Sequence, residues 1–363
     1  MIFRLHSIIA VLLFPALLFA QAKPPSKAAA APSPGGAYPV MSTQAKQRGQ
    51  QVFKMFDEGQ SAAIWATLAE GTKKNYGSEG KLAATIKSMR ERLGTEDKMA
   101  DEDFIPFLAK PWTLYARLSD FSKATNVQVV TNIAINEHGQ VEIFQVGPEH
   151  ALYQGRFGGY KDRTRLKLPF AGEWFVYQGG RSAFQNANFN YDDQRFAIDF
   201  ALLKNGRPFK GEGNDNSDYY CFGQPLLATA EGSVVDVQDG YQDNPPGRPV
   251  NDSPRGNMIL IAHGSSEFSL LTNLKQNSIK FKKGDKVKQG DVIAECGNSG
   301  PSPAPHVHYQ LQNSAGLPLP DSLPVQFVDY IADGKPVSVG EPVRGQMVSS
   351  APASSVAQPS STK

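Results

Sequence analysis

The sequence predicts an α+β N-terminal domain, with three helices and an antiparallel sheet, followed by an all-β domain. Between Val52 and Leu93 apolar residues recur every three or four positions, which is the spacing of amphipathic helices. Two strand-like runs follow, 126–136 and 140–146, and the short Gly-containing turn between them is typical of a β-hairpin. From about Arg165 onward, short apolar runs alternate with turn sequences, which predicts strands.

The expected helices are carried by Val52, Phe53 and Phe56, by Ile64, Trp65 and Leu68, and by Leu82, Ile86, Met89 and Leu93. The expected strands of the second domain are 168–170, 174–178, 196–203, 232–237, 257–263, 269–274 and 287–296. In element order the first domain is similar to the cone-shaped nuclear-transport-factor-2-like domains. It has no titratable cluster, so we expect a helper or binding module there.

The N-terminus predicts a secretory signal peptide over residues 1–22. Arg4 precedes a short apolar run, and the small residues of Ala20-Gln21-Ala22 offer a cleavage site. An uncleaved anchor is the alternative, although the apolar run is short for a membrane span. We therefore expect an exported chain with no stable membrane anchor after cleavage.

Two segments rich in Pro, Ala, Ser and Gly lack any apolar period. Residues 23–41 predict a flexible linker, and residues 340–363 predict a disordered tail. The folded domains are therefore expected at 42–150 and 160–335.

Composition narrows the functional classes. The 363 residues are 40% hydrophobic and 20% charged, enough for two domains with real cores, and the net charge is only +2. Mixed charge argues against a nucleic-acid partner, which would favour a basic face. Cys221 and Cys296 are the two cysteines of the chain, and they either form one disulfide in an oxidising compartment or stay as buried thiols.

A His-x-His motif is the strongest chemical signature. His306 and His308 follow a Gly-rich bend at 297–300, and residues at i and i+2 on a strand point to the same face. A catalytic zinc site needs about three protein ligands. Asp199, flanked by apolar residues, is a further candidate because a buried acid needs a partner or a metal. The alternative is two hydrogen-bonded histidines and a solvent-facing aspartate.

Several co-linear blocks carry a family resemblance. In order these are Ala197–Phe200, Phe222–Ala228, Glu231–Val235, Gly256–Gly264, Lys283–Ile293, Gly297–Gly300 and Pro305–Tyr309. Over about 196–312 the chain resembles the lysostaphin-like (LytM-type) zinc metallopeptidases, which cut peptide cross-links in bacterial peptidoglycan. The Cys221 and Cys296 blocks look like a cysteine-containing branch of that family.

The resemblance implies roles residue by residue. Asp199 and His308 match metal ligands, while His306 and Asn273 match the catalytic positions. The remaining ligand position falls on Arg195, which has no lone pair, opposes zinc and would favour an ion pair with Asp199. Asn273 can donate a hydrogen bond but cannot exchange a proton at neutral pH.

Other residues are candidates for the missing ligand. In some relatives of this branch a histidine lies further upstream, where this chain has Asn186-Ala187-Asn188. Asp192 or Asp193 could reach the metal if their loop folds back. His263 matches a position that is structural in the family.

Three functional hypotheses follow. The first is a secreted or periplasmic protein with a degenerate peptidase site that binds peptidoglycan peptides or regulates a partner hydrolase. The second is an active zinc metalloendopeptidase with a rearranged ligand set. The third, a carrier domain suggested by Lys283–Gly290, is minor because the same block is ordinary β-scaffold in the peptidase family. Zinc is the expected cofactor if the chain is active, and otherwise none.

Overall fold

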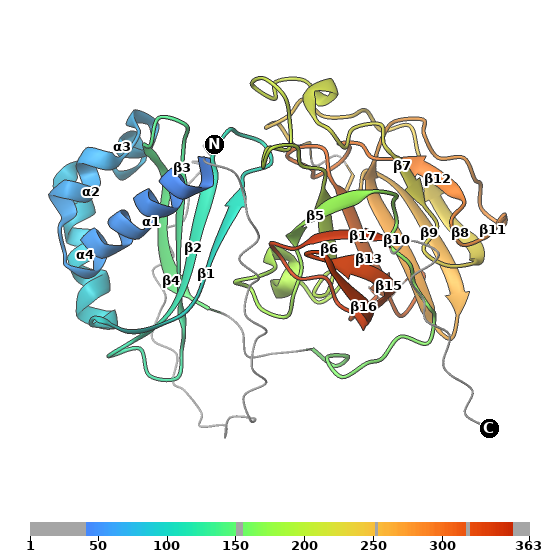
Figure 1. Ribbon diagram of the computed structural model, residues 1–363, viewed down its shortest axis with the longest axis horizontal. Coiled ribbons are helices and arrows are strands. Elements are labelled where there is room, and N and C mark those ends of the chain that lie inside the picture. The colour runs from blue at the N-terminus through green and yellow to red at the C-terminus, as the bar shows by residue number, and fades with distance from the viewer. Residues whose placement is uncertain (1–40, 150–154, 251–252, 317–319, 351–363) are drawn as a thin grey trace, which may run out of the picture. The chain divides into compact units, whose positions relative to one another are not determined.

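The computed structural model describes residues 41–149, 155–250, 253–316 and 320–350 (Figure 1). The expected signal peptide and most of the expected linker lie outside the described residues. So do the last 13 residues of the expected tail. In the described part of the chain, no helix is both long and apolar enough to span a membrane.

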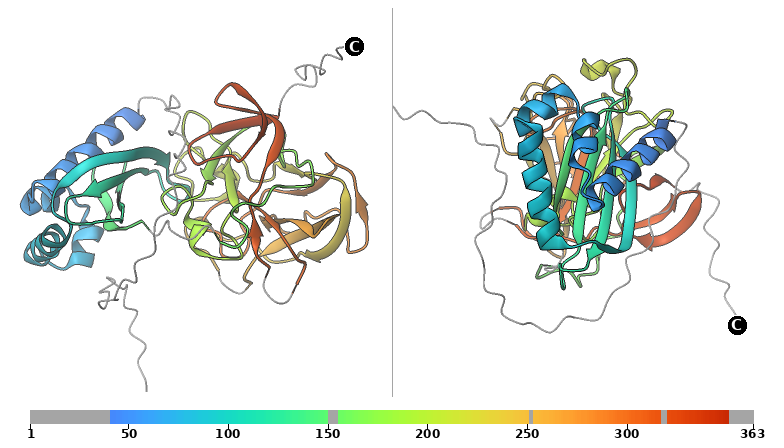
Figure 2. Two further views of the ribbon diagram at one scale, coloured as in Figure 1. Left: turned by 90° about the horizontal axis from the view of Figure 1, so that it is seen from below. Right: turned by 90° about the vertical axis from the view of Figure 1, so that its left-hand side faces the viewer.

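The first domain places four helices against a four-stranded antiparallel meander. The helices are α1 (Met41–Asp57), α2 (Ser61–Thr67), α3 (Glu70–Tyr76) and α4 (Glu79–Leu93). The strands are β1 (Glu96–Pro106), β2 (Thr113–Phe121), β3 (Val129–Ile135) and β4 (Val141–Pro148), in that order across the sheet. The helices lie across one face of the sheet (Figures 1 and 2). The predicted hairpin is confirmed as β3 and β4.

The apolar period explains which helices the sequence predicts, and capping fixes where α4 begins and ends. The N-cap Ser78 accepts a hydrogen bond from the Lys81 amide at 3.3 Å, and α4 ends at Gly94 with a positive φ of 79°. By contrast α3, which the sequence did not predict, is short and polar, and its one buried residue is Thr72. It has no apolar stripe, so its position depends on the neighbouring sheet, where Thr72 Oγ1 donates to the Glu142 carbonyl.

The core of this domain lies between the helices and the sheet. The buried cluster is formed by residues including Val52, Phe56, Ile64, Leu82 and Ile86 from the helices and Tyr115, Ile133 and Val141 from the strands. These helical residues are the ones whose spacing predicted the helices. Burying each large apolar side chain stabilises the fold by about 1.5–3 kcal/mol, which explains why the helices turn these residues toward the sheet.

The second domain is built on an 11-stranded antiparallel sheet with the order β11-β8-β9-β10-β13-β6-β5-β17-β15-β16, and β14 pairs with β13. Its strands are β5 (Glu173–Gln178), β6 (Ile198–Ala201), β8 (Gly232–Gln238), β9 (Asn257–Gly264), β10 (Glu267–Leu274), β11 (Lys286–Val287), β13 (Val307–Gln312), β14 (Ser322–Leu323), β15 (Phe327–Ala332), β16 (Lys335–Gly340) and β17 (Met347–Ser350). A small separate ladder joins β7 (Pro225–Leu227) to β12 (Val292–Glu295). The predicted all-β character is confirmed.

Three details differ from the sequence prediction. Residues 168–170 are buried without forming a strand, and the predicted strand at 287–296 is divided into β11 and β12. The tail prediction is wrong for residues 347–350, because β17 pairs with both β5 and β15. Val348 is fully buried in that position. Its burial and the strand pairing together order a segment whose composition indicates disorder.

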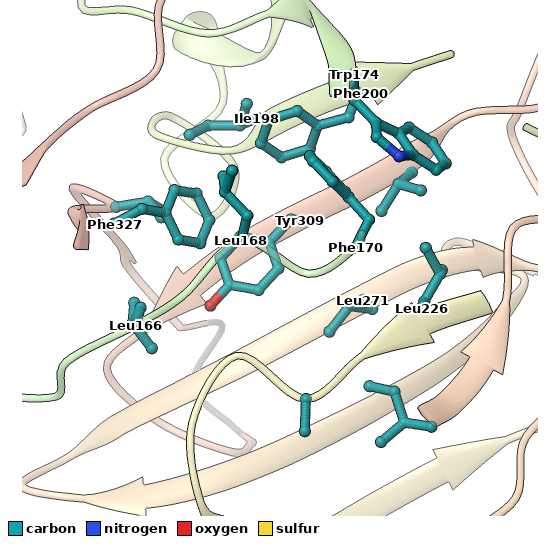
Figure 3. Packing of buried hydrophobic residues seen from close by; sticks show 14 of the residues in the cluster. Leu166, Leu168, Phe170, Trp174, Ile198, Phe200, Leu226, Leu271, Tyr309 and Phe327 are labelled. Atoms are coloured by element: carbon teal, nitrogen blue, oxygen red, sulfur yellow. The ribbon is translucent and has the colours of Figure 1, made fainter. Parts of the chain in front are cut away.

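Aromatic residues fill the core under the sheet (Figure 3). Phe170 stacks on Trp174 with ring centroids 4.6 Å apart and meets Phe200 edge-on at 4.9 Å. Tyr309 packs against Phe327 at 5.3 Å. Tyr309 lies on β13, so the strand that carries the His-x-His motif is held by the centre of the core.

Candidate functional site

Strand β13 has a core face and a polar face. The core face carries Val307, Tyr309 and Leu311, which are all fully buried. On the other face His308, Gln310 and Gln312 form a hydrogen-bonded row, which we call the polar row. His308 Nε2 lies 3.2 Å from Gln310 Oε1, and Gln310 Nε2 donates to Gln312 Oε1 at 2.8 Å. The two-residue repeat of a strand creates this division.

Asp199 and His308 lie opposite one another on the neighbouring strands β6 and β13. Directly paired residues share a face, and their side chains meet with 2.7 Å between Asp199 Oδ1 and His308 Nδ1. The second carboxylate oxygen, Oδ2, accepts from Asn188 Nδ2 at 3.2 Å. Asn188 belongs to the short 3₁₀ helix η1 (Ala187–Asn190). The sheet register therefore brings together the two predicted metal ligands, and the η1 turn adds an amide.

The electrostatics favour an ion pair at this position. Burial alone would raise the pKa of Asp199, but the His308 charge and hydrogen bond outweigh it and lower that pKa. Burial alone would likewise lower the pKa of His308, yet the charge and hydrogen bond of Asp199 raise it. Each group thus stabilises the ionised form of the other.

His306 enters from the bend before β13. Its Nδ1 lies 2.8 Å from the Ala304 carbonyl and 3.2 Å from Ser302 Oγ. A carbonyl can only accept, so Nδ1 carries the proton and Nε2 keeps the lone pair of the neutral ring. This arrangement orients His306 as an acceptor for a donor group on a ligand.

Asn273 occupies an irregular part of β10, between the register positions of Leu271 and Leu274. Its φ of 59° lies in the left-handed region that asparagine tolerates. Its Nδ2 donates to the Ser299 carbonyl at 2.9 Å. The predicted catalytic amide is therefore already used to hold the Gly-Asn-Ser-Gly bend.

Arg195 does not pair with Asp199 as the sequence had suggested, and that prediction is wrong. Its guanidinium donates to the Phe189 carbonyl and forms an ion pair with Asp192. Asp192 is largely exposed and engaged by Arg195, so it does not serve as the substitute ligand that was considered. Arg195 pairs with Asp192 because the two residues are only three positions apart, so the chain does not have to reverse to bring them together.

The donor set does not fit a three-ligand zinc centre. Throughout the described ranges, no three His, Cys, Asp or Glu residues are grouped so that they could hold a metal ion. Asp199 and His308 are a pair, and the third group against the carboxylate is the Asn188 amide. Zinc sites use histidine, cysteine and carboxylate ligands, so two suitable ligands and an amide leave zinc weakly held.

The site is shielded from solvent. Asp199, His306 and His308 each expose less than a tenth of their surface. Leu108, in the segment that follows β1, belongs to the same apolar cluster as Ala201 and Ala304. Ala201 is two residues from Asp199 on β6, so it shares the face on which Asp199 lies. The segment that carries Leu108 therefore packs against the face of β6 on which Asp199 lies.

Sequence reasoning left two residues of the site without a role. Asn188 lies in the segment already noted as the place of an upstream histidine in relatives, and its neighbour Asn186 instead donates to the carbonyls of Arg195 and Ala197. Gln310 was missed, although the two-residue spacing from His308 is a signal for the same face. His263 is structural, with Nδ1 2.7 Å from the Glu231 carbonyl and Nε2 2.7 Å from Ser269 Oγ.

Comparison with known proteins agrees with this fold. Residues 215–319 match the model of peptidase family M23. The match covers the His-x-His motif and begins after Asp199. The resemblance of the second domain to lysostaphin-like peptidases is thereby confirmed.

Individual relatives are more distant. The chain is 25% identical over 276 residues to the peptidoglycan DD-endopeptidase ShyA of Vibrio cholerae serotype O1, covering 69% of this chain and 55% of that protein. It is 32% identical over 120 residues to an uncharacterized metalloprotease of Haemophilus influenzae, covering 32% of this chain and 22% of that protein. Among solved structures, the catalytic domain of lysostaphin from Staphylococcus simulans is 20% identical with a TM-score of 0.23, covering 46% of this chain and 90% of that one. The chain spans about half the length of the Vibrio relative and a smaller share of the Haemophilus relative.

Proposed function

We propose that this chain, whose second domain contains a peptidase family M23 domain, is an exported protein of the cell envelope that binds peptidoglycan peptides without cleaving them. One observation carries this proposal. The two residues that match zinc ligands, Asp199 and His308, are hydrogen-bonded to each other, and an asparagine amide takes the remaining carboxylate oxygen.

The same residues offer recognition chemistry. His306 presents an acceptor nitrogen, and the half-buried Asn188 amide, which donates to Asp199, adds a second polar group to the site. Peptide groups have one donor and one acceptor each, so such a surface suits an extended peptide. A relative bears the name of a peptidoglycan DD-endopeptidase, which supports a peptidoglycan peptide as the ligand. Through that binding the chain would regulate a partner hydrolase acting on the same peptides.

An active zinc metalloendopeptidase is the second candidate. The orientation of His306 favours it. The Nδ1 proton of this ring is donated to the Ala304 carbonyl, which leaves Nε2 free to accept a proton or a hydrogen bond. This candidate needs a further ligand to approach Asp199 and His308. Asp193 is the nearest acid in sequence to consider, since its charge contributes to raising the pKa of His308.

The deciding experiment measures zinc content and ligand binding in the same preparation. The purified full chain is dialysed against zinc-containing and then zinc-free buffer, analysed for metal, and sedimented with peptidoglycan sacculi. The Asp199→Ala/His308→Ala variant is the matched control. We expect no zinc above the control, no release of peptide fragments from the sacculi, and co-sedimentation of the wild-type chain that falls in the variant.

About one zinc per chain together with fragment release would replace the binding proposal with the endopeptidase. Absence of both zinc and co-sedimentation would reject both candidates. If binding is slow because the site is shielded, the Leu108→Ser variant is expected to co-sediment more than wild type, because it removes an apolar contact over the face that carries Asp199.

A further inference from the structure

The two cysteines of the chain lie in adjacent segments of the second domain. Cys221 and Cys296 belong to the same apolar cluster, with exposures of 1% and 0%. Their backbones are joined by a short ladder, in which the Gly223 amide donates to the Cys296 carbonyl at 2.8 Å and the Cys296 amide donates to the Gln224 carbonyl at 2.9 Å. The segments are thus held in register whatever the state of the sulfurs.

The sulfurs are close to one another. Burial raises the pKa of the Cys296 thiol, and a hydrogen bond and charge effect from the Cys221 thiol raise it further. Both residues are free thiols in the structure. Because the chain has two cysteines in all, an intramolecular disulfide can form only between Cys221 and Cys296.

Both cysteines also border the candidate site. Cys221 Sγ donates to the Pro305 carbonyl at 3.1 Å, one residue before His306. Cys296 precedes Gly297, which forms an isolated β-bridge with His306. The pair therefore lies behind the bend that carries the first histidine of the motif.

We propose that Cys221 and Cys296 form a disulfide that ties the loop before β7 to the end of β12 and fixes the backbone under His306. Each thiol gives up one proton and the sulfur–sulfur bond forms. The two electrons pass to a disulfide oxidant, such as oxidised glutathione, which is reduced to two thiols. The inference is independent of zinc and of peptide binding.

The bond has a clear physical effect. It closes a long loop between residues 221 and 296, and restricting the unfolded chain over such a length stabilises the folded state. The segments are already joined by backbone hydrogen bonds, so little rearrangement is required. Oxidation also removes the thiol hydrogen that Cys221 donates to Pro305, and the covalent link replaces this contact.

The test is refolding of the full chain in a glutathione redox buffer. The reduced, denatured protein is refolded with oxidised and reduced glutathione, quenched with acid, denatured without reductant and treated with N-ethylmaleimide. We expect an intact mass two hydrogens below that of the dithiol chain, with no maleimide and no glutathione attached. Two maleimides, glutathione adducts or a disulfide-linked dimer would each overturn the proposal.

Cys221→Ser is the matched control, because its hydroxyl can still donate to the Pro305 carbonyl. After the same treatment it should carry one maleimide or one glutathione. Dithiothreitol should lower the thermal midpoint of the oxidised wild type by on the order of 10 °C and leave Cys221→Ser unchanged. An equal response of the two proteins to reductant would show that the bond does not hold these segments.

Discussion

The two faces of β13 differ in how strictly their residues are constrained. On the core face Tyr309 is fully buried, packs against Phe327, and shares its hydroxyl with Ser269 at 2.6 Å and Thr229 at 3.1 Å. On the polar face His308 meets Asp199 through a pairing that depends on two side chains. The core face is constrained by packing and the polar face by local hydrogen bonds, so residues on the polar face can change with less effect on the scaffold.

Asn188 and Asn273 illustrate this difference. Asn273 lies at a strand irregularity and was matched to a catalytic position of the family, whereas Asn188 lies in a 3₁₀ turn within the segment where some relatives have a histidine. Both keep a hydrogen bond, to Asp199 and to the Ser299 carbonyl. The two amides therefore hold groups of the site through local hydrogen bonds.

The largest effect is expected from the core face. Tyr309→Ala should lower the free energy of unfolding by about 3–5 kcal/mol, because it leaves a cavity under the sheet. Tyr309→Phe, the matched control, removes only the hydroxyl and should cost about 1 kcal/mol, since Thr229 and Ser269 still contact each other at 3.1 Å. Urea denaturation measures both, and equal losses for the two variants would contradict the cavity argument.

The half-buried carboxylate of Asp162 gives a contrast to Asp199. Burial raises the pKa of Asp162 to about 7, and its Oδ1 is buried without a hydrogen-bond partner among the described residues. Between the unfolded value of 3.8 and about 7 the folded state holds a proton that the unfolded state has released. Stability should therefore fall as pH rises through this window, by roughly 2–4 kcal/mol.

Asp162→Asn tests that assignment. It keeps an acceptor for the Gln326 amide, which donates to Asp162 Oδ2 at 2.6 Å in the wild type. The variant should lose this part of the pH dependence and be more stable than wild type at pH 8. Parallel stability curves for the two proteins from pH 4 to 8 would exclude Asp162 as the titrating group.

The ion pair on the polar face should lose stability at both ends of the pH range, with His308 acting in the same direction as Asp162 and Asp199 in the opposite direction. The raised pKa of His308 gives a stabilisation that is complete below 6.5 and is lost as pH rises through the folded value. The lowered pKa of Asp199 gives one that is present above 3.8 and is lost as pH falls through its folded value. Together they should produce a stability plateau between these two usual values.

His308→Ala should remove the plateau and cost roughly 2–3 kcal/mol near pH 6, because Asp199 is left buried with the Asn188 amide. Asp199→Asn should remove the same pH dependence. The double variant should cost less than the sum of the single losses, since both act on one pair. Additive losses at pH 6 would contradict the ion pair.

The smallest change in stability is expected from Asn188→His. It places an imidazole beside Asp199 and His308 and completes a set of three conventional zinc ligands, with an expected stability change within about 0.5 kcal/mol in the absence of metal. Zinc bound after dialysis should rise toward one per chain, measured by metal analysis. Asn186→His, where the side chain faces backbone carbonyls, is the control and should bind no additional zinc.

The sequence by itself determined the elements whose evidence is local. The helices between Val52 and Leu93 and the β3–β4 hairpin follow from the repeats of helix and strand, which depend on neighbours within a few residues. Composition at the C-terminus predicted disorder and failed at β17, because pairing with β5 and β15 comes from distant parts of the chain.

Only the tertiary structure decided which side chains meet. Asp199 lies opposite His308 because β6 pairs with β13 across 109 residues of sequence, and Asn188 completes the contact from the η1 turn. Arg195 turned to Asp192, its near neighbour, rather than to Asp199. The sequence supplies the hydrogen-bond donors and acceptors. Which of them pair depends on strand register and on the neighbouring groups within reach, and both are properties of the folded chain.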